Sequence, residues 1–237
     1  MIRRLDDPEL VREQYASEGG LRARQALWRE LEGPNPRDVL WDAIVAAEPR
    51  TVLEVGGGDG WLAERIQREL GCDVVLVDQS ERMVDLARAR GVDALVGDVQ
   101  ALTFADGAFD TAIAAWMLYH VPDLDRGLAE LARVLAPRGR LIANTNSRRH
   151  AEEMFDLIGY PPERREWVFN AENGEDALRR HFAEVVRTDV VAVATVRDRQ
   201  TLTDYRDSML VDVDPVPENV PLPLRVHSRG VVFVATT

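Results

Sequence analysis

The chain has 237 residues, a formal net charge of -12 and one cysteine, Cys72, so one α/β domain of ordinary size is expected and an internal disulfide is excluded. A surface this acidic repels phosphate backbones, which argues against a nucleic-acid partner unless a local basic patch overrules it. The sequence shows no apolar run long enough to span a bilayer and no secretory leader, which predicts a cytoplasmic protein without membrane attachment.

Residues 1–48 are predicted to form a helical cover that precedes the sheet. Charged residues at helical spacing run to Gly33, and residues 38–47 predict a second, short helix. We expect this cover to be a lid that excludes water from a ligand site at the sheet. Within the cover, Arg24 could pair with a ligand carboxylate and Tyr15 could close the same end. Alternatively, both side chains lie on a solvated helix face.

Residues 51–70 form the unit around which the sequence is organised: a strand, a glycine turn and a helix. The apolar, β-branched run 51–55 is typical of a buried parallel strand, and apolar residues at helical spacing follow until Gly71. Between them lie the glycines that allow a sharp turn and the close approach of a ligand, namely Gly56, Gly57, Gly58 and Gly60. This arrangement indicates a nucleotide-type α/β site.

Two classes of ligand compete for such a turn. The spacing of Gly58, Gly60 and Ala63 also fits the dinucleotide pattern G-x-G-x-x-G/A, which is a weak signal alone. Glu54 argues against a pyrophosphate, because a carboxylate two residues before the first glycine would repel it. A cationic ligand without phosphates fits better, and S-adenosylmethionine (SAM) carries a sulfonium, an amino group, a ribose and an adenine. The alternative role of Glu54 is to accept hydrogen bonds from the amides of the turn.

The second predicted strand, residues 73–78, ends in an acidic residue that suits a nucleoside. Asp78 can accept hydrogen bonds from both ribose hydroxyls. Ser80 is expected to cap the following helix, whose first turn carries Met83. Met83 is expected to pack in the core and could also touch the adenine.

A third short strand is predicted for residues 93–96. Asp98, shortly after it, could accept a hydrogen bond from the adenine amino group, with the backbone amide of Val99 beside it. The alternative role of Asp98 is that of a turn residue.

Tyr119 and His120 directly follow the fourth predicted strand, residues 109–118. Ligands of open α/β sheets bind outside the carboxyl ends of strands, so both side chains are expected to face the site. His120 is the candidate general base because free imidazole titrates near neutrality, and Tyr119 could orient the substrate. Alternatively, His120 only packs or hydrogen-bonds the backbone. No Cys or His cluster has metal-ligand spacing, so no metal is expected.

The motifs VLEVGGGDG and VVLVD, followed by the run that begins GDVQALTFADGAFD, together resemble the class I SAM-dependent methyltransferases, in particular the methyltransferase-11-like small-molecule subfamily. The resemblance covers residues 51–146. It implies a Rossmann-like, seven-stranded and mostly parallel sheet of order 3-2-1-4-5-7-6, with the last strand antiparallel and helices on both faces. It also implies a cofactor site lined by Glu54, Gly56, Gly58, Gly60, Asp78, Asp98 and Val99. Neighbouring residues assigned to the same site are Gly57, Gln79, Met83 and Trp116.

The remaining part of the chain, residues 147–237, is predicted to shape the substrate site and to add the last strands. Residues 147–172 look like a substrate-shaping insertion, residues 185–196 predict the sixth strand and residues 231–234 the seventh. Helices are expected over residues 175–182 and 201–211. The whole chain, 1–237, is therefore predicted to be one domain whose cofactor-binding core is residues 51–146.

The predicted function is SAM-dependent methyl transfer to an oxygen, nitrogen or carbon nucleophile of a small organic molecule by in-line displacement, leaving S-adenosylhomocysteine (SAH) as product. Three alternatives stay open: an RNA or protein methyltransferase, a non-catalytic SAM-binding partner protein, and a nicotinamide-dependent dehydrogenase. A homodimer is also left open.

Overall fold

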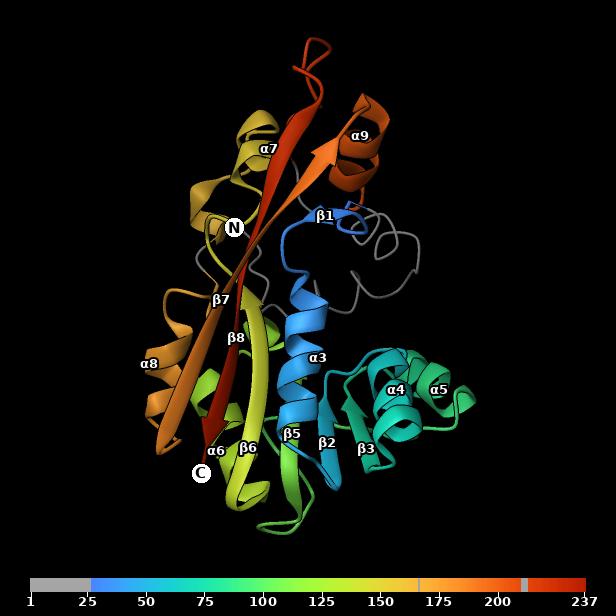
Figure 1. The fold of residues 1–237 in the computed structure, drawn as a ribbon, viewed down its shortest axis with the longest axis vertical. Helices are drawn as coiled ribbons and strands as arrows, with labels where there is room; N and C mark the ends of the chain where they lie inside the picture. The colour runs from blue at the N-terminus through green and yellow to red at the C-terminus, as the bar shows by residue number, and fades with distance from the viewer. Residues whose placement is uncertain (1–26, 166, 210–212) are drawn as a thin grey trace.

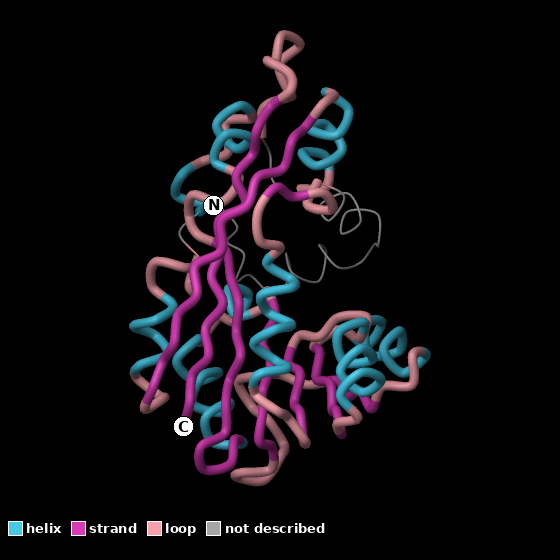
Figure 2. The backbone as a smooth tube through the Cα atoms, viewed as in Figure 1, coloured by secondary structure: helices cyan, strands magenta, loops and turns pink. Residues whose placement is uncertain are grey.

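A computed structural model describes residues 27–237 except 166 and 210–212. Its centre is an eight-stranded mixed sheet of order β1-β7-β8-β6-β5-β2-β3-β4 (Figures 1 and 2). Five neighbouring strands run parallel, namely β2 (Thr51–Val55), β3 (Asp73–Asp78), β4 (Asp93–Val96), β5 (Phe109–Ala115) and β6 (Leu135–Asn146). β8 (Leu224–Thr236) is antiparallel to both of its neighbours, β6 and β7 (Glu184–Val196). The sheet is therefore mostly parallel, with β8 reversed between β6 and β7 and the edge strand at β7 reversed as well.

The predicted order 3-2-1-4-5-7-6 is present as β4-β3-β2-β5-β6-β8-β7, but the prediction of seven strands is wrong by one. The extra strand is β1 (Leu31–Glu32), which pairs with Ala194 and Val193 of β7. Helical spacing had assigned this segment to the N-terminal cover. The open edge of β7 offers unpaired backbone groups there, and pairing with them outweighs a weak helical preference.

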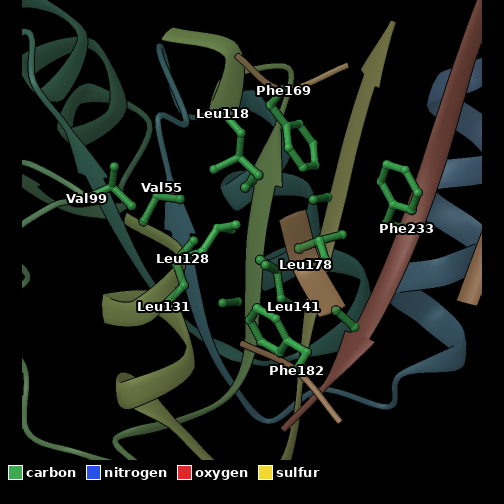
Figure 3. Packing of buried hydrophobic residues seen from close by; sticks show 14 of the residues in the cluster. Val55, Val99, Leu118, Leu128, Leu131, Leu141, Phe169, Leu178, Phe182 and Phe233 are labelled. Carbon is green, nitrogen blue, oxygen red and sulfur yellow. The ribbon is translucent and has the colours of Figure 1, made fainter. Parts of the chain in front are cut away.

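Helices cover both faces of the sheet, as the resemblance implied. On one face α3 (Pro36–Ala46), α4 (Trp61–Leu70) and α5 (Glu81–Ala89) share a buried cluster with β2, β3 and β6. On the other face α6 (Leu124–Val134) and α8 (Gly174–Arg179) pack on the same strands through a second cluster (Figure 3). Consecutive strand residues alternate between the two clusters, Val52 facing one and Leu53 the other, because strand side chains alternate in direction. The central strands are therefore buried on both faces.

The distal ends of β7 and β8 extend past the parallel strands and carry a third hydrophobic cluster (Figure 1). We call this region the distal subassembly: β1, α7 (Glu152–Leu157), α9 (Arg199–Asp207) and the strand ends that they cover. Asp198 begins α9, with its carboxylate accepting from the amide of Thr201 at 2.8 Å. The distal subassembly is built mainly from residues after 147, the part predicted to shape the substrate site.

Several element bounds differ from those predicted. The fifth and seventh strands are longer than the apolar runs 141–143 and 231–234, because β6 and β8 pair with each other over Arg140–Asn146 and Thr236–Gly230 whatever the polarity of the outward side chains. The fourth strand ends at Ala115, and residues Leu118–His120 form a 3-10 turn, η1, instead of a strand end. Among the residues that the structure describes, no helix is both long and apolar enough to cross a membrane.

Candidate functional site

A cavity of about 1190 Å³ lies at the carboxyl ends of the parallel strands and continues to the distal subassembly. Its sheet end is lined by the loops after β2, β3, β4 and β5. Its distal end is lined by aromatic residues from four places: the residues directly before β1, helix α7, helix α9, and the segment between α7 and α8. Open α/β sheets place ligands at this edge, so the cavity is the candidate functional site.

The glycine turn after β2 brings backbone directly to the cavity wall. A Cβ on Gly56 would lie 2.7 Å from the Cβ of Met117, and one on Gly57 would lie 2.6 Å from Cδ1 of Leu76. Gly58 has a φ of +57° and a Cβ there would meet nothing within 4 Å, so its position is open. All three glycines line the cavity. Gly60, by contrast, is not among the cavity-lining residues; its Cα packs against α5, where an added Cβ would lie 2.8 Å from that of Ala87.

Glu54 is a buried carboxyl group without a full set of partners. Its side chain lines the cavity, the residue is 2 % exposed, and Oε2 has no hydrogen-bond partner among the described residues. Burial raises the pKa of Glu54 to about 8, against a smaller opposing effect of the Ala63 amide, while Asp78 and Asp59 add like-charge repulsion. The Ala63 amide belongs to the first turn of α4 and not to the glycine turn, so the alternative role of Glu54 as acceptor to the turn amides stays a prediction.

Asp78 lies at the end of β3 and also lines the cavity, together with Gln79 and Met83. Its Oδ2 accepts from the amide of Gly58 at 3.0 Å and its Oδ1 accepts from the amide of Ser80 at 2.9 Å. Burial raises the pKa of Asp78, and these two amides oppose the rise. Each oxygen keeps a lone pair after one such bond, so the carboxylate can still accept from a ligand.

Asp98 and Val99 line the cavity after β4. Asp98 Oδ1 accepts from the amide of Gln100 at 2.9 Å, which is the turn geometry predicted as its alternative role. Val99 is buried against the α6 side of the sheet. Their roles toward an adenine stay predictions.

The segment after β5 places Trp116, Tyr119 and His120 on the cavity wall. Trp116 has a φ of +52°, which is costly for a bulky side chain, and its amide donates to Oδ1 of Asn144 at 3.0 Å. The rings of Tyr119 and His120 lie 4.4 Å apart, and Tyr119 lies 5.8 Å from Trp167. The strained backbone at Trp116 therefore turns η1 toward the cavity.

Arg37 is a cavity residue that the sequence reasoning missed. It lies in the first turn of α3, which begins after the Asn35 cap, and its Cζ stands 5.3 Å from the ring centroid of Trp61. Burial lowers the pKa of its guanidinium, and no carboxylate within 27–237 forms an ion pair with it in the described structure. In the sequence, Asn35 followed by Pro36 indicates the start of a helix here. That pattern does not indicate that Arg37 lines the cavity. Tyr15 and Arg24, the predicted lid contacts, lie outside the described residues.

Three histidines for which the sequence suggested no partner each have one. His181 Nε2 contacts Asp125 Oδ1 at 2.9 Å, and His227 Nδ1 contacts the carboxylate of Glu153. His150 Nδ1 accepts from the amide of Arg229 at 3.2 Å, and His150 also lines the cavity. No group of three or more possible metal ligands occurs among the residues with described positions.

Residues 53–143 match the family model described as a methyltransferase domain, over the same strands and loops that line the sheet end of the cavity. Over these residues, fewer than half of the chain, the protein is similar to that family. The match confirms the resemblance to SAM-dependent methyltransferases that the motifs indicated.

Curated relatives carry the same domain. A demethylmenaquinone methyltransferase of Thermus thermophilus is 38% identical over 117 residues, which cover 44% of this chain and 53% of that protein. A ubiquinone/menaquinone biosynthesis C-methyltransferase, UbiE, of Dinoroseobacter shibae is 35% identical over 115 residues, or 45% of this chain and 46% of the relative. The chain thus spans about half the length of the curated relatives it matches. The methyltransferase domain is shared, whereas the distal subassembly lies outside the family model.

Among solved structures, phosphoethanolamine N-methyltransferase 2 of Haemonchus contortus in complex with phosphomonomethylethanolamine and SAH superimposes with a TM-score of 0.62. The identity is 15%, and the match covers 99% of this chain and 60% of the other. At this identity the likeness shows the fold alone, an α/β fold with a mixed, mostly parallel sheet.

Proposed function

We propose that the chain is a SAM-dependent methyltransferase that transfers a methyl group to an oxygen, nitrogen or carbon nucleophile of a small organic molecule. The observation that carries this proposal is the buried carboxyl of Glu54 at the glycine turn, with one oxygen lacking a partner among the described residues. A pyrophosphate would add negative charge at this point, whereas a sulfonium or ammonium would compensate it. The methyltransferase-domain match over the same residues supports the same ligand.

Three further side chains suit the remaining parts of SAM. Asp78 keeps lone pairs for the ribose hydroxyls, and Asp98 can accept from the adenine amino group. Arg37 takes the role that the sequence suggested for Arg24, because it lines the cavity and its guanidinium can form a charge-assisted pair with the carboxylate of the methionine moiety. Gly56, Gly57 and Gly58 line the cavity, and a Cβ at Gly58 would meet no protein atom within 4 Å, so a ligand can contact the backbone of the turn there.

When bound, SAM supplies a methyl group that is electrophilic without further activation. The chain then has to hold the nucleophile in line, exclude water and, for a protonated nucleophile, accept a proton. His120 is the proposed base and Tyr119 the orienting residue, since both lie on η1 at the cavity wall. Trp116 before them, held in its strained backbone conformation by Asn144, keeps η1 in place.

A small-molecule acceptor is supported by the names of both curated relatives, which methylate quinone precursors by name. The cavity volume of about 1190 Å³ exceeds the 300 to roughly 1,000 Å³ typical of a single ligand, so two molecules can share it. The net charge of -12 opposes a nucleic-acid acceptor. Acceptor atom and partner are otherwise left to experiment.

Calorimetry on ligand-free protein tests the proposal. We expect heat and saturable binding with SAM and with SAH, and none with NAD. Binding of NAD alone would favour a dehydrogenase and overturn the proposal. Protein that binds SAM but transfers no tritiated methyl group to any of a panel of phenols, quinols, amines, tRNA and proteins would be a non-catalytic SAM-binding protein. Transfer to the RNA or protein fraction alone would overturn the small-molecule acceptor.

The proposed contact of Arg37 with the methionine carboxylate can be tested with two ligands that differ in that carboxylate. SAH carries the methionine carboxylate, and 5′-methylthioadenosine lacks it. Arg37→Ala should weaken SAH binding by about tenfold, the loss of one charge-assisted hydrogen bond, and leave methylthioadenosine affinity unchanged. Arg65→Ala is the matched control, because the Arg65 guanidinium also stacks on a tryptophan, 3.7 Å from the Trp41 ring centroid, and does not line the cavity. An equal loss for both ligands would reject the carboxylate contact.

A further inference from the structure

The distal end of the cavity is an aromatic chamber to which three separate segments contribute. Trp28 precedes β1, Phe155 and Tyr160 belong to α7 and its following turn, and Tyr205 lies in α9. Phe155 and Tyr160 stack with ring centroids 4.7 Å apart, while Trp28 lies edge-on to Tyr205 at 6.5 Å. Flat aromatic walls of this kind favour a planar apolar ligand.

Besides Ser228, which is also buried and lines the cavity, His150 is a buried polar group in this chamber. It follows β6, is 7 % exposed, and its ring centroid lies 4.7 Å from that of Trp28. The backbone amide of Arg229 donates to Nδ1 at 3.2 Å, so Nδ1 must be the acceptor nitrogen of the ring. The ring proton therefore lies on Nε2, the nitrogen on the other side of the ring.

The charge state of His150 is settled by its surroundings. Burial lowers its pKa to about 4, and the positive charge of Arg229 acts in the same direction, so the ring is neutral at pH 7. A neutral ring with Nδ1 already occupied cannot take a second proton readily. It can donate one hydrogen bond from Nε2.

The described lining residues of the aromatic chamber carry no carboxylate. Glu153 of α7, which does not line the cavity, contacts the ring of His227 and accepts from the His227 backbone amide at 3.1 Å. A cationic amine would therefore enter this chamber without a counter-charge, whereas an oxygen acceptor finds a donor in His150.

We propose that the aromatic chamber holds the methyl acceptor and that His150 Nε2–H donates a hydrogen bond to an oxygen of that acceptor. This hydrogen bond selects uncharged aromatic compounds that carry a carbonyl or hydroxyl oxygen over aliphatic amines. This inference rests on the proposed function. His150 is here a specificity-determining residue and not the base, a role that stays with His120.

Three probes of one carbon skeleton test the inference: 1-tetralone with a carbonyl oxygen, tetralin without it, and 1-aminotetralin with an ammonium group. Dissociation constants are measured by NMR titration of protein saturated with SAH. We expect 1-tetralone to bind about three- to tenfold more tightly than tetralin, the usual worth of one hydrogen bond, and 1-aminotetralin to bind most weakly. Equal binding of 1-tetralone and tetralin, or strongest binding of the amine, would overturn the inference.

Two matched variants assign the effect to one nitrogen. In His150→Asn the side-chain oxygen can still accept from the Arg229 amide, but no donor reaches the position of Nε2. In His150→Gln the amide nitrogen can occupy that position. We expect the tetralone-to-tetralin ratio to fall to one in His150→Asn and to persist in His150→Gln. A purely structural role of His150 would weaken both probes equally and leave the ratio unchanged, which would refute the assignment.

A measurement on the unaltered protein keeps the test independent of how the variants fold. The ¹⁵N and ¹H shifts of His150 Nε2 should move on addition of 1-tetralone and stay in place on addition of tetralin; identical shifts would count against the hydrogen bond. SAH calorimetry separates the two levels of failure. Protein that does not bind SAH contradicts the proposed function, whereas protein that binds SAH and ignores the carbonyl contradicts only the role of His150.

Discussion

Replacing Glu54 by glutamine should change how the stability of the ligand-free protein depends on pH. The pKa of Glu54 is raised from 4.5 to about 8 by burial. A group with a raised pKa in the folded state stabilises the fold fully below its unfolded pKa, and that contribution is lost as the pH rises through the folded pKa. The relevant window therefore runs from about pH 4.5 to about pH 8.

The size of the effect follows from the pKa shift. With 1.36 kcal/mol per pKa unit, the titration of Glu54 alone should lower the free energy of unfolding of the wild type by about 3 to 4 kcal/mol between pH 5 and pH 8. Glu54→Gln does not titrate and lacks this loss. At pH 5 the variant is expected to be less stable than the wild type, because the glutamine amide places buried N–H donors at the unpartnered site of Oε2. As the pH rises, the difference in the free energy of unfolding should shift in favour of the variant.

Urea unfolding of both proteins at pH 5, 6, 7 and 8 measures the difference. Using the difference between wild type and variant cancels every other titrating group that the substitution leaves undisturbed. Glu218→Gln, at an exposed glutamate in the loop before β8, is the matched control and should give a curve parallel to the wild type. If the Glu54→Gln curve also stays parallel to the wild type within about 0.5 kcal/mol, the buried-carboxyl argument is refuted, and with it the main support for a cationic ligand.

The remaining predictions concern binding, catalysis and folding. Asp78→Ala should weaken SAH binding by at least about 1 kcal/mol in calorimetry, and unchanged affinity would reject its ribose role. Gly57→Ala should weaken SAH binding and lower Tm, because the added Cβ would meet Leu76 Cδ1 at 2.6 Å; an unaffected Tm would show that the turn can relax. Asp123→Ala should cost about 1 kcal/mol in urea unfolding, since Oδ1 of Asp123 accepts from the first-turn amide of Arg126 at 3.1 Å. His120→Ala should reduce kcat about a hundredfold with an acceptor found by the methyl-transfer panel, and near-normal turnover would leave His120 a packing residue.

Predictions for the first three parallel strands agree with the structure to the residue. β2, β3 and β4 occupy the ranges predicted for them, because each is a short apolar run that a glycine or aspartate ends. The signals for the long antiparallel strands were weaker. In β6 and β8 the sequence mixes polar and apolar residues, and hydrogen bonding to a neighbouring strand decides their length.

Residues that lie far apart in sequence meet in the distal half of the site. The donor to His150 is the amide of Arg229, 79 residues later, and the ring beside it is that of Trp28. No local pattern around His150 indicates either neighbour. For the same reason no local pattern placed Arg37 at the cavity, to which only the packing of α3 brings it, whereas the contact predicted for Arg24 lies outside the described residues.

From its sequence alone, this protein could be placed in an α/β class with a glycine turn and acidic strand ends, because those features depend on neighbours within a few residues. The ligand-facing positions of Glu54 and Asp78 follow from the same local rules, since parallel strands share one carboxyl edge. The eighth strand, the guanidinium of Arg37 and the neutral, donating ring of His150 were decided by tertiary structure. Each depends on burial and on hydrogen-bond partners that only the folded chain brings together.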